Sequence, residues 1–350
     1  MITPQKVLVL GGGSIGLATA IELAQNGAEV TILNHQPKSA ALYAAAGMLA
    51  PQAERIQEPH FLDLCLQSRN LYPEWIQGLE AIAQLYGGYW PCGILSPLYS
   101  APDSSDTAQD CQWFDQSAIR KAYPYLSRDV IGGWLYRKDA QVNNRLLGQV
   151  LNRAAQAVGV KVHHDVTINS LVSRGDRIYQ VKTQSGDWSA DHYLLTTGAW
   201  TGMLGDVPVV PRKGQMLAVT PMDGYPAIGL NQVLFGEKVY IVPRQTGEVI
   251  IGATSEDVGF TPGNTAGGVH KLLNAAIRLL PKLSEYEIYQ QWWGYRPTTP
   301  DELPILGASP WENLSIASGH YRNGILLTPI TARLMSQHIL KGDVEATLSP

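Results

Sequence analysis

The chain has 350 residues, of which 45% are hydrophobic, and its 26 basic and 30 acidic residues give a formal net charge of −4 at pH 7. The length indicates about two domains with sizeable cores, and an acidic balance without a Lys/Arg cluster excludes a nucleic-acid partner. No uncharged run approaches the ~20 residues of a membrane helix, and the first strand is expected within about six residues of Met1, which leaves no room for a signal peptide. The three cysteines show no metal-ligand spacing and are expected to be reduced thiols. We therefore expect a cytoplasmic protein with no membrane partner and no metal.

The N-terminal region has the pattern of a nucleotide-binding unit. An apolar run at residues 7–10 predicts a strand buried on both faces, and the spacing Gly11-x-Gly13-x-x-Gly16 follows it. Apolar residues at helical spacing come next, and a second apolar run spans residues 30–33. This order of strand, glycine turn, helix and strand makes the glycine motif far more specific than it would be alone.

Each glycine of the motif has a physical role. Gly11 permits a tight turn, Gly13 lets the backbone approach a pyrophosphate, and Gly16 lets the helix pack closely on the strand. The N-terminus of the helix that follows offers free N–H groups and the positive end of the helix dipole to the phosphates.

The second strand ends at Asn34 and His35, which we count among the cofactor contacts. An acidic residue usually stands at this point and accepts hydrogen bonds from the ribose hydroxyls. The amide of Asn34 can still bond a hydroxyl, but it carries no charge. No arginine follows, so the extra phosphate of NADPH has no partner. The next run, residues 40–51, consists largely of small residues. It predicts either a tightly packed helix or a wall against which a flat ring system lies.

The middle of the chain alternates between helical and turn-rich segments. A helical pattern runs from Phe61 to Leu85, and Pro73 should end or kink that helix. Turns dominate residues 87–136, including the segment 101–105, so a domain boundary is expected near residue 80. A helix is predicted over 145–158, and short strands should follow.

Two later segments complete the pattern. Residues 191–200 read as an apolar strand that runs into a glycine turn at Gly198, as in the return strand of an FAD-binding domain. Residues 207–289 alternate as in an antiparallel sheet, with one helix at about 270–280. The last segment, 314–335, reads as strand, glycine-bounded loop and helix. Its helix N-terminus is a second anion site, suited to negative charge on a reduced flavin.

These motifs together resemble those of a known family. The opening glycine motif, Ala44-Ala-Ala-Gly-Met-Leu49, Tyr240-Ile-Val-Pro-Arg244, Arg296-Pro297 and Gly319-His-Tyr-Arg-Asn-Gly-Ile-Leu-Leu327 are similar to those of the FAD-dependent amino-acid oxidases of the D-amino-acid oxidase and sarcosine oxidase superfamily. Within that superfamily the resemblance is strongest to the glycine oxidases that supply thiamine thiazole synthesis, and it covers nearly the whole chain.

The resemblance implies an α/β fold with a Rossmann-like FAD-binding domain of the glutathione reductase type and an α+β substrate domain built on an antiparallel sheet. It implies that residues 1–80, 145–205 and 295–350 form the discontinuous FAD-binding domain, and that residues 81–144 and 206–294 form the substrate domain. It also implies noncovalent FAD, because relatives with covalent flavin use a cysteine in the C-terminal part, and none follows Cys111 here. The implied cofactor contacts, beyond the glycines, Asn34 and His35 given above, are Ser14, Ile15, Ala46, Gly47, Met48, Ile168, Gly198, His320, Tyr321, Arg322, Asn323, Gly324, Ile325 and Leu326.

The implied reaction is oxidative deamination of glycine, or of small amines such as sarcosine or D-alanine, by hydride transfer to the flavin. The products are an imine that hydrolyses to glyoxylate and ammonia, and hydrogen peroxide formed from oxygen. The flavin carries out this chemistry, so the protein must hold the substrate carboxylate, which a bidentate arginine does best. Arg296 is the expected clamp, with Tyr240 and Arg322 beside it.

Several alternatives remain open. The chain departs from the family at Asn34 and at Ala41-Leu42, where a hydroxyl pair usually helps to hold the cofactor, and Ser255 replaces a methionine common in the substrate pocket. The electron acceptor could be a quinone or carrier, as in a D-amino-acid dehydrogenase, and a sarcosine oxidase-like substrate would fit the same motifs. An NAD-dependent dehydrogenase and a flavoprotein subunit without its own turnover are less consistent with the sequence. Whether the chain forms a homo-oligomer is also left open.

Overall fold

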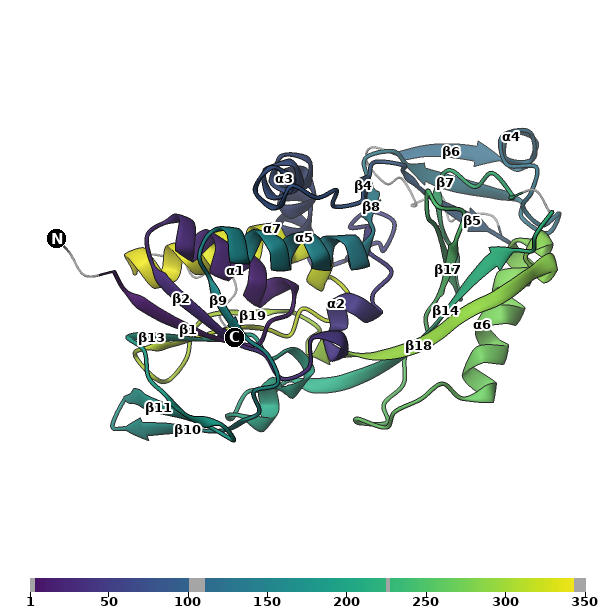
Figure 1. Ribbon diagram of the computed structural model, residues 1–350. Coiled ribbons are helices and arrows are strands. Elements are labelled where there is room, and N and C mark those ends of the chain that lie inside the picture. The colour runs from purple at the N-terminus through teal and green to yellow at the C-terminus, as the bar shows by residue number, and fades with distance from the viewer. Residues whose placement is uncertain (1–3, 101–110, 225–226, 343–350) are drawn as a thin grey trace.

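The computed structural model describes residues 4–100, 111–224 and 227–342, and it contains two large sheets side by side (Figure 1). The turn segment expected at 101–105 lies outside the described residues. One sheet carries the nucleotide-binding motif, and the strands of the other come from residues 94–136 and 210–298. The two sheets confirm the α/β fold class with a second, antiparallel part.

The first sheet has six strands in the order β19-β20-β13-β1-β2-β9. All neighbours are parallel except β19 and β20. Their bounds are β1 Lys6–Leu10, β2 Glu29–Leu33, β9 Lys161–His163, β13 His192–Leu195, β19 Ile305–Ala308 and β20 Leu314–Ser318. Strands from the beginning, middle and end of the chain therefore lie in one sheet.

Both faces of this sheet are covered, which explains the unbroken apolar run in β1. Val7 and Val9 pack into a core shared with the helices, whereas Leu8 and Leu10 pack into a separate core on the other face. The helices on one face are α1 Ser14–Gln25, α3 Pro59–Ala83, α5 Asn144–Ala157 and α7 Gly324–Lys341 (Figure 1). The other face is covered by a three-stranded antiparallel sheet of β10 Ile168–Arg174, β11 Arg177–Thr183 and β12 Gly186–Trp188.

The second large sheet has eight strands in the order β18-β14-β17-β16-β15-β5-β7-β6. The prediction of an antiparallel sheet is confirmed, although β15 and β5 pair in parallel. The strands are β5 Ile94–Leu98, β6 Cys111–Asp115, β7 Gly132–Tyr136, β14 Val210–Pro221, β15 Val233–Phe235, β16 Tyr240–Pro243, β17 Val249–Gly252 and β18 Tyr286–Thr298. The predicted helix in this region is α6 Ala266–Leu279, and α4 Gln116–Ala122 follows β6.

Shorter elements connect the two parts. The small-residue run forms α2 Ala41–Ala44 and β3 Met48–Leu49, and β3 pairs with β8 Ala140–Val142, which also pairs with β4 Tyr89–Trp90. The remaining elements are the 3₁₀ helices η1 Pro37–Ser39, η2 Gly198–Met203 and η3 Pro281–Glu285.

One boundary differs from the sequence expectation. Pro73 does not end α3, which continues to Ala83. Pro73 lies on the exposed side of the helix, while Tyr72 and Ile76 are buried in the core on the other side. Packing of the buried side therefore holds the helix together despite the missing N–H group. Among the described helices, none combines the length and the apolar character that crossing a bilayer would require.

Candidate cofactor and substrate site

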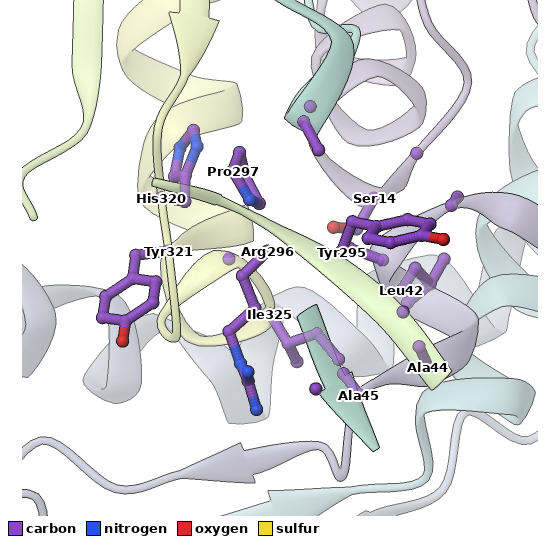
Figure 2. Close-up of a pocket in the computed structure, with 18 of the residues that line it drawn as sticks. Ser14, Leu42, Ala44, Ala45, Tyr295, Arg296, Pro297, His320, Tyr321 and Ile325 are labelled. Carbon is purple, nitrogen blue, oxygen red and sulfur yellow. The ribbon is translucent and has the colours of Figure 1, made fainter. Parts of the chain in front are cut away.

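A cavity of about 660 Å³ lies where the two sheets meet, within the range of roughly 300–1,000 Å³ typical of ligand sites. Its lining comes from α1, α2, β16, β18 and the start of α7, elements that are far apart in the sequence. Figure 2 shows Ser14, Leu42, Arg296 and Ile325 around this space. The two expected anion sites, at the N-termini of α1 and α7, thus open into one cavity.

The glycine loop fits a bound pyrophosphate. Gly11 has φ +115°, and a Cβ atom there would lie 2.4 Å from the carbonyl oxygen of Thr196. A Cβ at Gly16 would lie 2.0 Å from the carbonyl oxygen of Gly11, so this glycine serves the packing of helix on strand and does not line the cavity. At Gly13 a Cβ would meet no protein atom within 4 Å, because this position faces the open cavity. The three positions therefore match the three roles expected from the spacing.

The first turn of α1 leaves its donors available to a ligand. Its N-cap residue is Gly13, which supplies no capping side chain, and the first turn contains no acidic residue. Ser14 and Ile15 line the cavity. An uncapped helix N-terminus that faces a cavity is suited to phosphate oxygens.

Beyond the glycine loop, the cavity is lined by Asn34, His35 and Ile168, as expected for the adenosine end. Asn34 is buried, and its amide lies so close to Gly12 that a Cβ there would be 2.7 Å from Nδ2. The ring of His35 shares a hydrogen bond of 3.1 Å with the hydroxyl of Thr167. The uncharged amide of Asn34 is therefore positioned by packing at the point where relatives of this fold place a carboxylate.

The small-residue segment forms the adjoining wall. Gly47 has φ +81°, and a Cβ there would lie 1.9 Å from the carbonyl oxygen of Val142. Buried Arg244 donates to the carbonyl of Ala46 at 2.8 Å and to Oδ1 of Asn144 at 3.0 Å. Burial lowers the pKa of Arg244 to about 10, so the guanidinium stays charged at neutral pH. Arg244 thus holds the wall in place, and Ala46, Gly47 and Met48 present little side-chain bulk to the cavity.

The second glycine-bounded loop approaches from the opposite side. Tyr321 adopts φ +46°, and its N–H donates to the carbonyl of Pro297 at 2.8 Å. Nε2 of His320 is hydrogen-bonded to Thr331 at 3.1 Å, and burial lowers the pKa of His320 to about 3, which keeps the ring neutral. The N-cap of α7, Asn323, makes no side-chain capping bond. The structure therefore leaves the α7 N-terminus free for a ligand.

Two further predicted contacts of this loop do not line the cavity. His320, Tyr321, Arg322, Gly324 and Ile325 line it, as does Gly198 in the return strand's turn, but Asn323 and Leu326 do not. The side chain of Leu326 is buried in the helix-side core, and its carbonyl accepts a hydrogen bond from Ser68 at 2.6 Å. The sequence places Leu326 next to residues expected to contact the cofactor, but the direction of its side chain depends on how α7 packs.

Arg296 on β18 and Tyr240 on β16 both line the cavity from the second sheet, in which β14 and β17 lie between these two strands. Nη1 of Arg296 donates to the carbonyl of Thr254 at 3.1 Å. The guanidinium packs over Gly214, where a Cβ would lie 2.5 Å from Nη1. The hydroxyl of Tyr240 donates to the sulfur of Met216 at 3.3 Å. Burial raises the pKa of Tyr240, and Arg296 only partly opposes this shift, so the phenol stays protonated and can donate.

Arg322 lines the same end of the cavity. Its guanidinium lies 5.1 Å from the centre of the Tyr321 ring, and Nη2 donates to the Tyr321 hydroxyl at 3.3 Å. The three substrate-binding candidates, Arg296, Tyr240 and Arg322, are thus brought together by β18, β16 and the loop before α7.

Sequence reasoning missed Glu54, whose side chain belongs to the same end of the cavity. Burial raises its pKa to about 7, although Arg322 and Arg296 act in the opposite direction. No motif marked this residue. The sequence signal that could have identified Glu54 is its carboxyl group, which closely follows the largely apolar run of small residues at 40–51.

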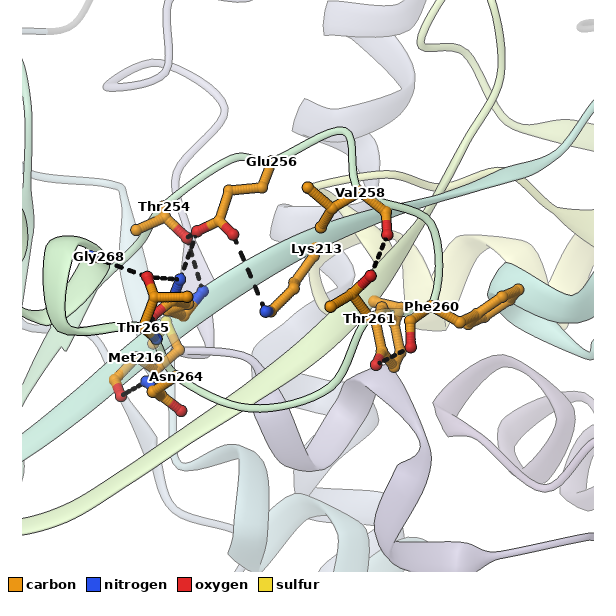
Figure 3. A network of polar contacts seen from close by, with 12 residues as sticks. Lys213, Met216, Thr254, Glu256, Val258, Phe260, Thr261, Asn264, Thr265 and Gly268 are labelled. Atoms are coloured by element: carbon orange, nitrogen blue, oxygen red, sulfur yellow. Dashed lines mark hydrogen bonds and ion pairs between the residues drawn. The ribbon is translucent and has the colours of Figure 1, made fainter.

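A polar network surrounds Thr254, whose carbonyl accepts the hydrogen bond from Arg296 (Figure 3). The hydroxyl of Thr254 donates to Oε1 of Glu256 at 2.5 Å and accepts from the N–H of Gln215 at 2.9 Å. Nε2 of Gln215 also donates to Oε1 of Glu256 at 2.7 Å, and Nζ of buried Lys213 lies 3.9 Å from Oε2. The network fixes Thr254, whose carbonyl then orients the guanidinium of Arg296.

The uncapped glycine loop and the second helix N-terminus open into one cavity, an arrangement typical of proteins that bind a dinucleotide cofactor. Residues 6–338 match the family model described as FAD dependent oxidoreductase. The chain therefore belongs to the family of FAD-dependent oxidoreductases, whose cofactor is FAD.

Individual proteins in this family are similar to the chain over most of its length. The chain is 49% identical to the bifunctional protein ThiO/ThiG of Trichormus variabilis over 99% of its own length and 54% of that protein. It thus spans about half the length of the curated relatives it first matches. It is 29% identical to the glycine oxidase of Bacillus subtilis over 97% of this chain and 94% of that one. The crystal structure of glycine oxidase from Geobacillus kaustophilus superposes with a TM-score of 0.90 at 30% identity, covering 97% of this chain and 96% of that chain.

Proposed function

We propose that the protein oxidises glycine, and small amines such as sarcosine or D-alanine, with FAD and molecular oxygen. The products would be the 2-oxo acid formed by hydrolysis of an imine (glyoxylate from glycine or sarcosine), ammonia or the corresponding amine, and hydrogen peroxide. The observation that carries this proposal is the presence of Arg296 and Tyr240 at the end of the cavity that adjoins Ala46, Gly47 and Met48. Similarity to proteins named glycine oxidase supports the same choice.

The glycine loop, the small-residue wall and the α7 N-terminus would hold FAD, which would supply the acceptor for a hydride from the substrate Cα. The protein's own task is to orient a small zwitterion. The guanidinium of Arg296 offers two parallel N–H groups to the substrate carboxylate, and the protonated phenol of Tyr240 adds a third donor. The carbonyl of Thr254 keeps the guanidinium in place from behind.

Other residues complete the site. His320 is buried and neutral, so it adds no positive charge that would compete for the carboxylate. The α7 N-terminus would stabilise negative charge on the flavin, as Gly324 and Ile325 line the cavity there. Ser255 also lines the cavity and would make this part of the pocket more polar than a methionine would.

The organisation of the chain follows from the same proposal. We propose that residues 1–80, 145–205 and 295–350 form the FAD-binding domain and that residues 81–144 and 206–294 form the substrate domain. The strand order supports this division, because all six strands of the first sheet fall in the former ranges. FAD would be held without a covalent bond, since none of the described residues that line the cavity is a cysteine. We also propose a cytoplasmic location and a role of the imine in thiamine thiazole synthesis.

The test is a substrate panel on the purified holoprotein with peroxide detection. Glycine, sarcosine, D-alanine and D-proline are compared, with an anaerobic arm in which bleaching of the flavin is followed. Peroxide formation with glycine or another small amine is the expected result. Bleaching without peroxide in air would instead support a dehydrogenase with another electron acceptor, and no bleaching with any amine would refute the proposal.

A further inference from the structure

Glu54 lies in a segment that the fold holds firmly at the substrate end of the cavity. The N–H of Glu54 donates to the carbonyl of Ala50 at 2.9 Å, which closes a turn directly after β3. The adjacent N–H of Ala53 donates to Oδ2 of Asp139 at 2.9 Å. Oδ1 of Asp139 in turn accepts from Nη1 of Arg69 at 2.7 Å in a buried ion pair. The position of Glu54 is therefore fixed by contacts that do not involve its own carboxyl group.

The charges at the substrate end of the cavity are complementary to those of an amino-acid zwitterion. Arg296 and Arg322 supply two positive groups, and Glu54 supplies one negative group in the same cavity. An α-carboxylate placed against Arg296 leaves the α-ammonium one carbon away, in need of an acceptor. The groups that interact electrostatically with Glu54, from each element packed around it, are Arg296, Arg322, Asp139, Tyr240 and Cys65. Among these groups the carboxyl group is that of Asp139, which does not line the cavity.

The alternative proton acceptors are unsuitable. His320 is hydrogen-bonded to Thr331, and its low pKa makes it a weak base. Tyr240 has a raised pKa and remains a donor. Glu54 has a pKa of about 7, close to the operating pH at which a general base is most effective.

We infer that Glu54 is a catalytic residue that receives the substrate's α-ammonium group and removes one proton from it. This inference rests on the proposed amine oxidation. In the step, one N–H bond of the ammonium breaks, an O–H bond forms on the Glu54 carboxylate, and the electron pair stays on nitrogen. The amine is then neutral, and its lone pair can assist departure of the hydride from Cα. No oxidant or reductant enters this step.

The test compares Glu54→Gln with the wild-type holoenzyme in anaerobic flavin reduction by glycine between pH 6 and 10. The carboxylate form of Glu54 grows as pH rises, so wild-type kcat/KM for glycine should increase up to about pH 7 and then level off. The variant lacks the acceptor and must use the small fraction of glycine that is already neutral. Its kcat/KM should be lower by about 10²–10⁴-fold at pH 7 and should keep rising about tenfold per pH unit, so that the gap closes at high pH.

Binding of glycolate separates proton transfer from a structural role. Glycolate has the carboxylate of glycine but no amine, so its Kd, measured by perturbation of the flavin absorbance, should not rise in Glu54→Gln, because the substitution removes a negative charge near the bound carboxylate. Glu54→Asp should retain the wild-type shape of the pH profile at reduced rate, because it keeps a carboxylate. Glu287→Gln is a control for loss of a carboxylate, since Glu287 is exposed on β18 and does not line the cavity, and it should behave as the wild type.

The outcomes distinguish this inference from the proposed function. Wild-type holoenzyme that reduces its flavin with glycine, together with a Glu54→Gln profile that parallels it, would overturn the role of Glu54 alone. Weaker glycolate binding in proportion to the lost activity would also overturn it, because the residue would then only shape the pocket. Absence of flavin reduction by any amine in the wild type would overturn both. If Glu54→Gln does not retain FAD, the Glu54→Asp profile decides the question.

Discussion

The two ends of the cavity differ in the groups that form them: backbone at the nucleotide end and side chains at the substrate end. The nucleotide end consists of backbone: Gly11, Gly13 and Gly16 shape it, and the N–H groups at the start of α1 supply the donors. The substrate end consists of charged and polar side chains, with Arg296 on β18 and Glu54 after β3. A backbone site needs particular residues only where a side chain would obstruct it, whereas a side-chain site needs particular residues everywhere.

This difference determines what can be changed. At the nucleotide end, the harmful changes are additions, since a methyl group meets the carbonyl of Thr196 at Gly11. At the substrate end, the harmful changes should be removals, since the role proposed for Arg296 and Glu54 is to pair with charged groups of the substrate. The predictions below test this contrast.

Gly11→Ala should have the largest effect. The added Cβ would lie 2.4 Å from the Thr196 carbonyl oxygen in a backbone conformation with φ +115°. The strained conformation alone costs roughly 1–3 kcal/mol, and the backbone clash adds to it. We expect loss of FAD from the purified protein and a lower unfolding midpoint, measured by absorbance at the flavin band and by thermal denaturation.

Gly13→Ala is the matched control for that variant. A Cβ at Gly13 meets no protein atom within 4 Å and points into the cavity. The apoprotein should therefore unfold at nearly the wild-type temperature, while its affinity for FAD falls. Equal destabilisation of the two apoproteins would contradict the assignment of Gly13 to the ligand and of Gly11 to the turn.

Arg296→Ala should have the next largest effect, at the opposite end. Losing one charged hydrogen-bond partner costs roughly 2–5 kcal/mol, which corresponds to about a 30- to 5,000-fold loss in kcat/KM for glycine. FAD should remain bound, because the nucleotide end is untouched. Steady-state kinetics with peroxide detection measures the loss, and Arg296→Lys should recover only part of it, since a single ammonium cannot donate in parallel. Unchanged kinetics would remove Arg296 from the site.

The same contrast explains how much the sequence could predict. The spacing of Gly11, Gly13 and Gly16 predicted the nucleotide end, because its function is local and needs only a turn and a helix start. The parallel and antiparallel sheets followed from apolar runs and alternation. The substrate end depends on elements far apart in the chain, and only resemblance to a family singled out Arg296 and Tyr240. The resemblance did not identify Glu54, because the role inferred for it depends on two arginines that tertiary packing brings close to it.

Packing also decided details that periodicity could not. Pro73 remains inside α3 because the opposite side of the helix is buried. Leu326 points into the core, although it lies in a loop-helix segment whose neighbours line the cavity. Both depend on the direction in which a helix faces, which is a property of the assembled fold.

Thr254→Val should have a moderate effect on the KM for glycine, and it tests whether the polar network around Thr254 belongs to the substrate end. The substitution keeps the carbonyl that receives Arg296 but removes the hydroxyl that joins Glu256 and Gln215. A guanidinium misplaced by a fraction of an ångström should raise KM for glycine by about tenfold, with a smaller change in kcat. Thr261→Val is the control, because the Thr261 hydroxyl donates only to the carbonyl of Val258 within an exposed turn. Equal kinetics of the two variants would show that the network does not position Arg296.

Asn34→Asp should have the smallest effect and should improve the nucleotide end. Asn34 stands where a carboxylate would accept hydrogen bonds from the ribose hydroxyls, and charge-assisted bonds are stronger than neutral ones. The difference should tighten FAD binding by about 2- to 10-fold, as expected for roughly 0.5–1.5 kcal/mol. Titration of the apoprotein with FAD, followed by flavin fluorescence, measures this change, and Asn34→Ala should weaken binding by a similar factor. Because Asn34 is buried against Gly12, a carboxylate left without the ribose would be poorly solvated. Weaker FAD binding in Asn34→Asp would therefore mean that the hydroxyls do not reach this residue, and that backbone groups alone hold the nucleotide at this end.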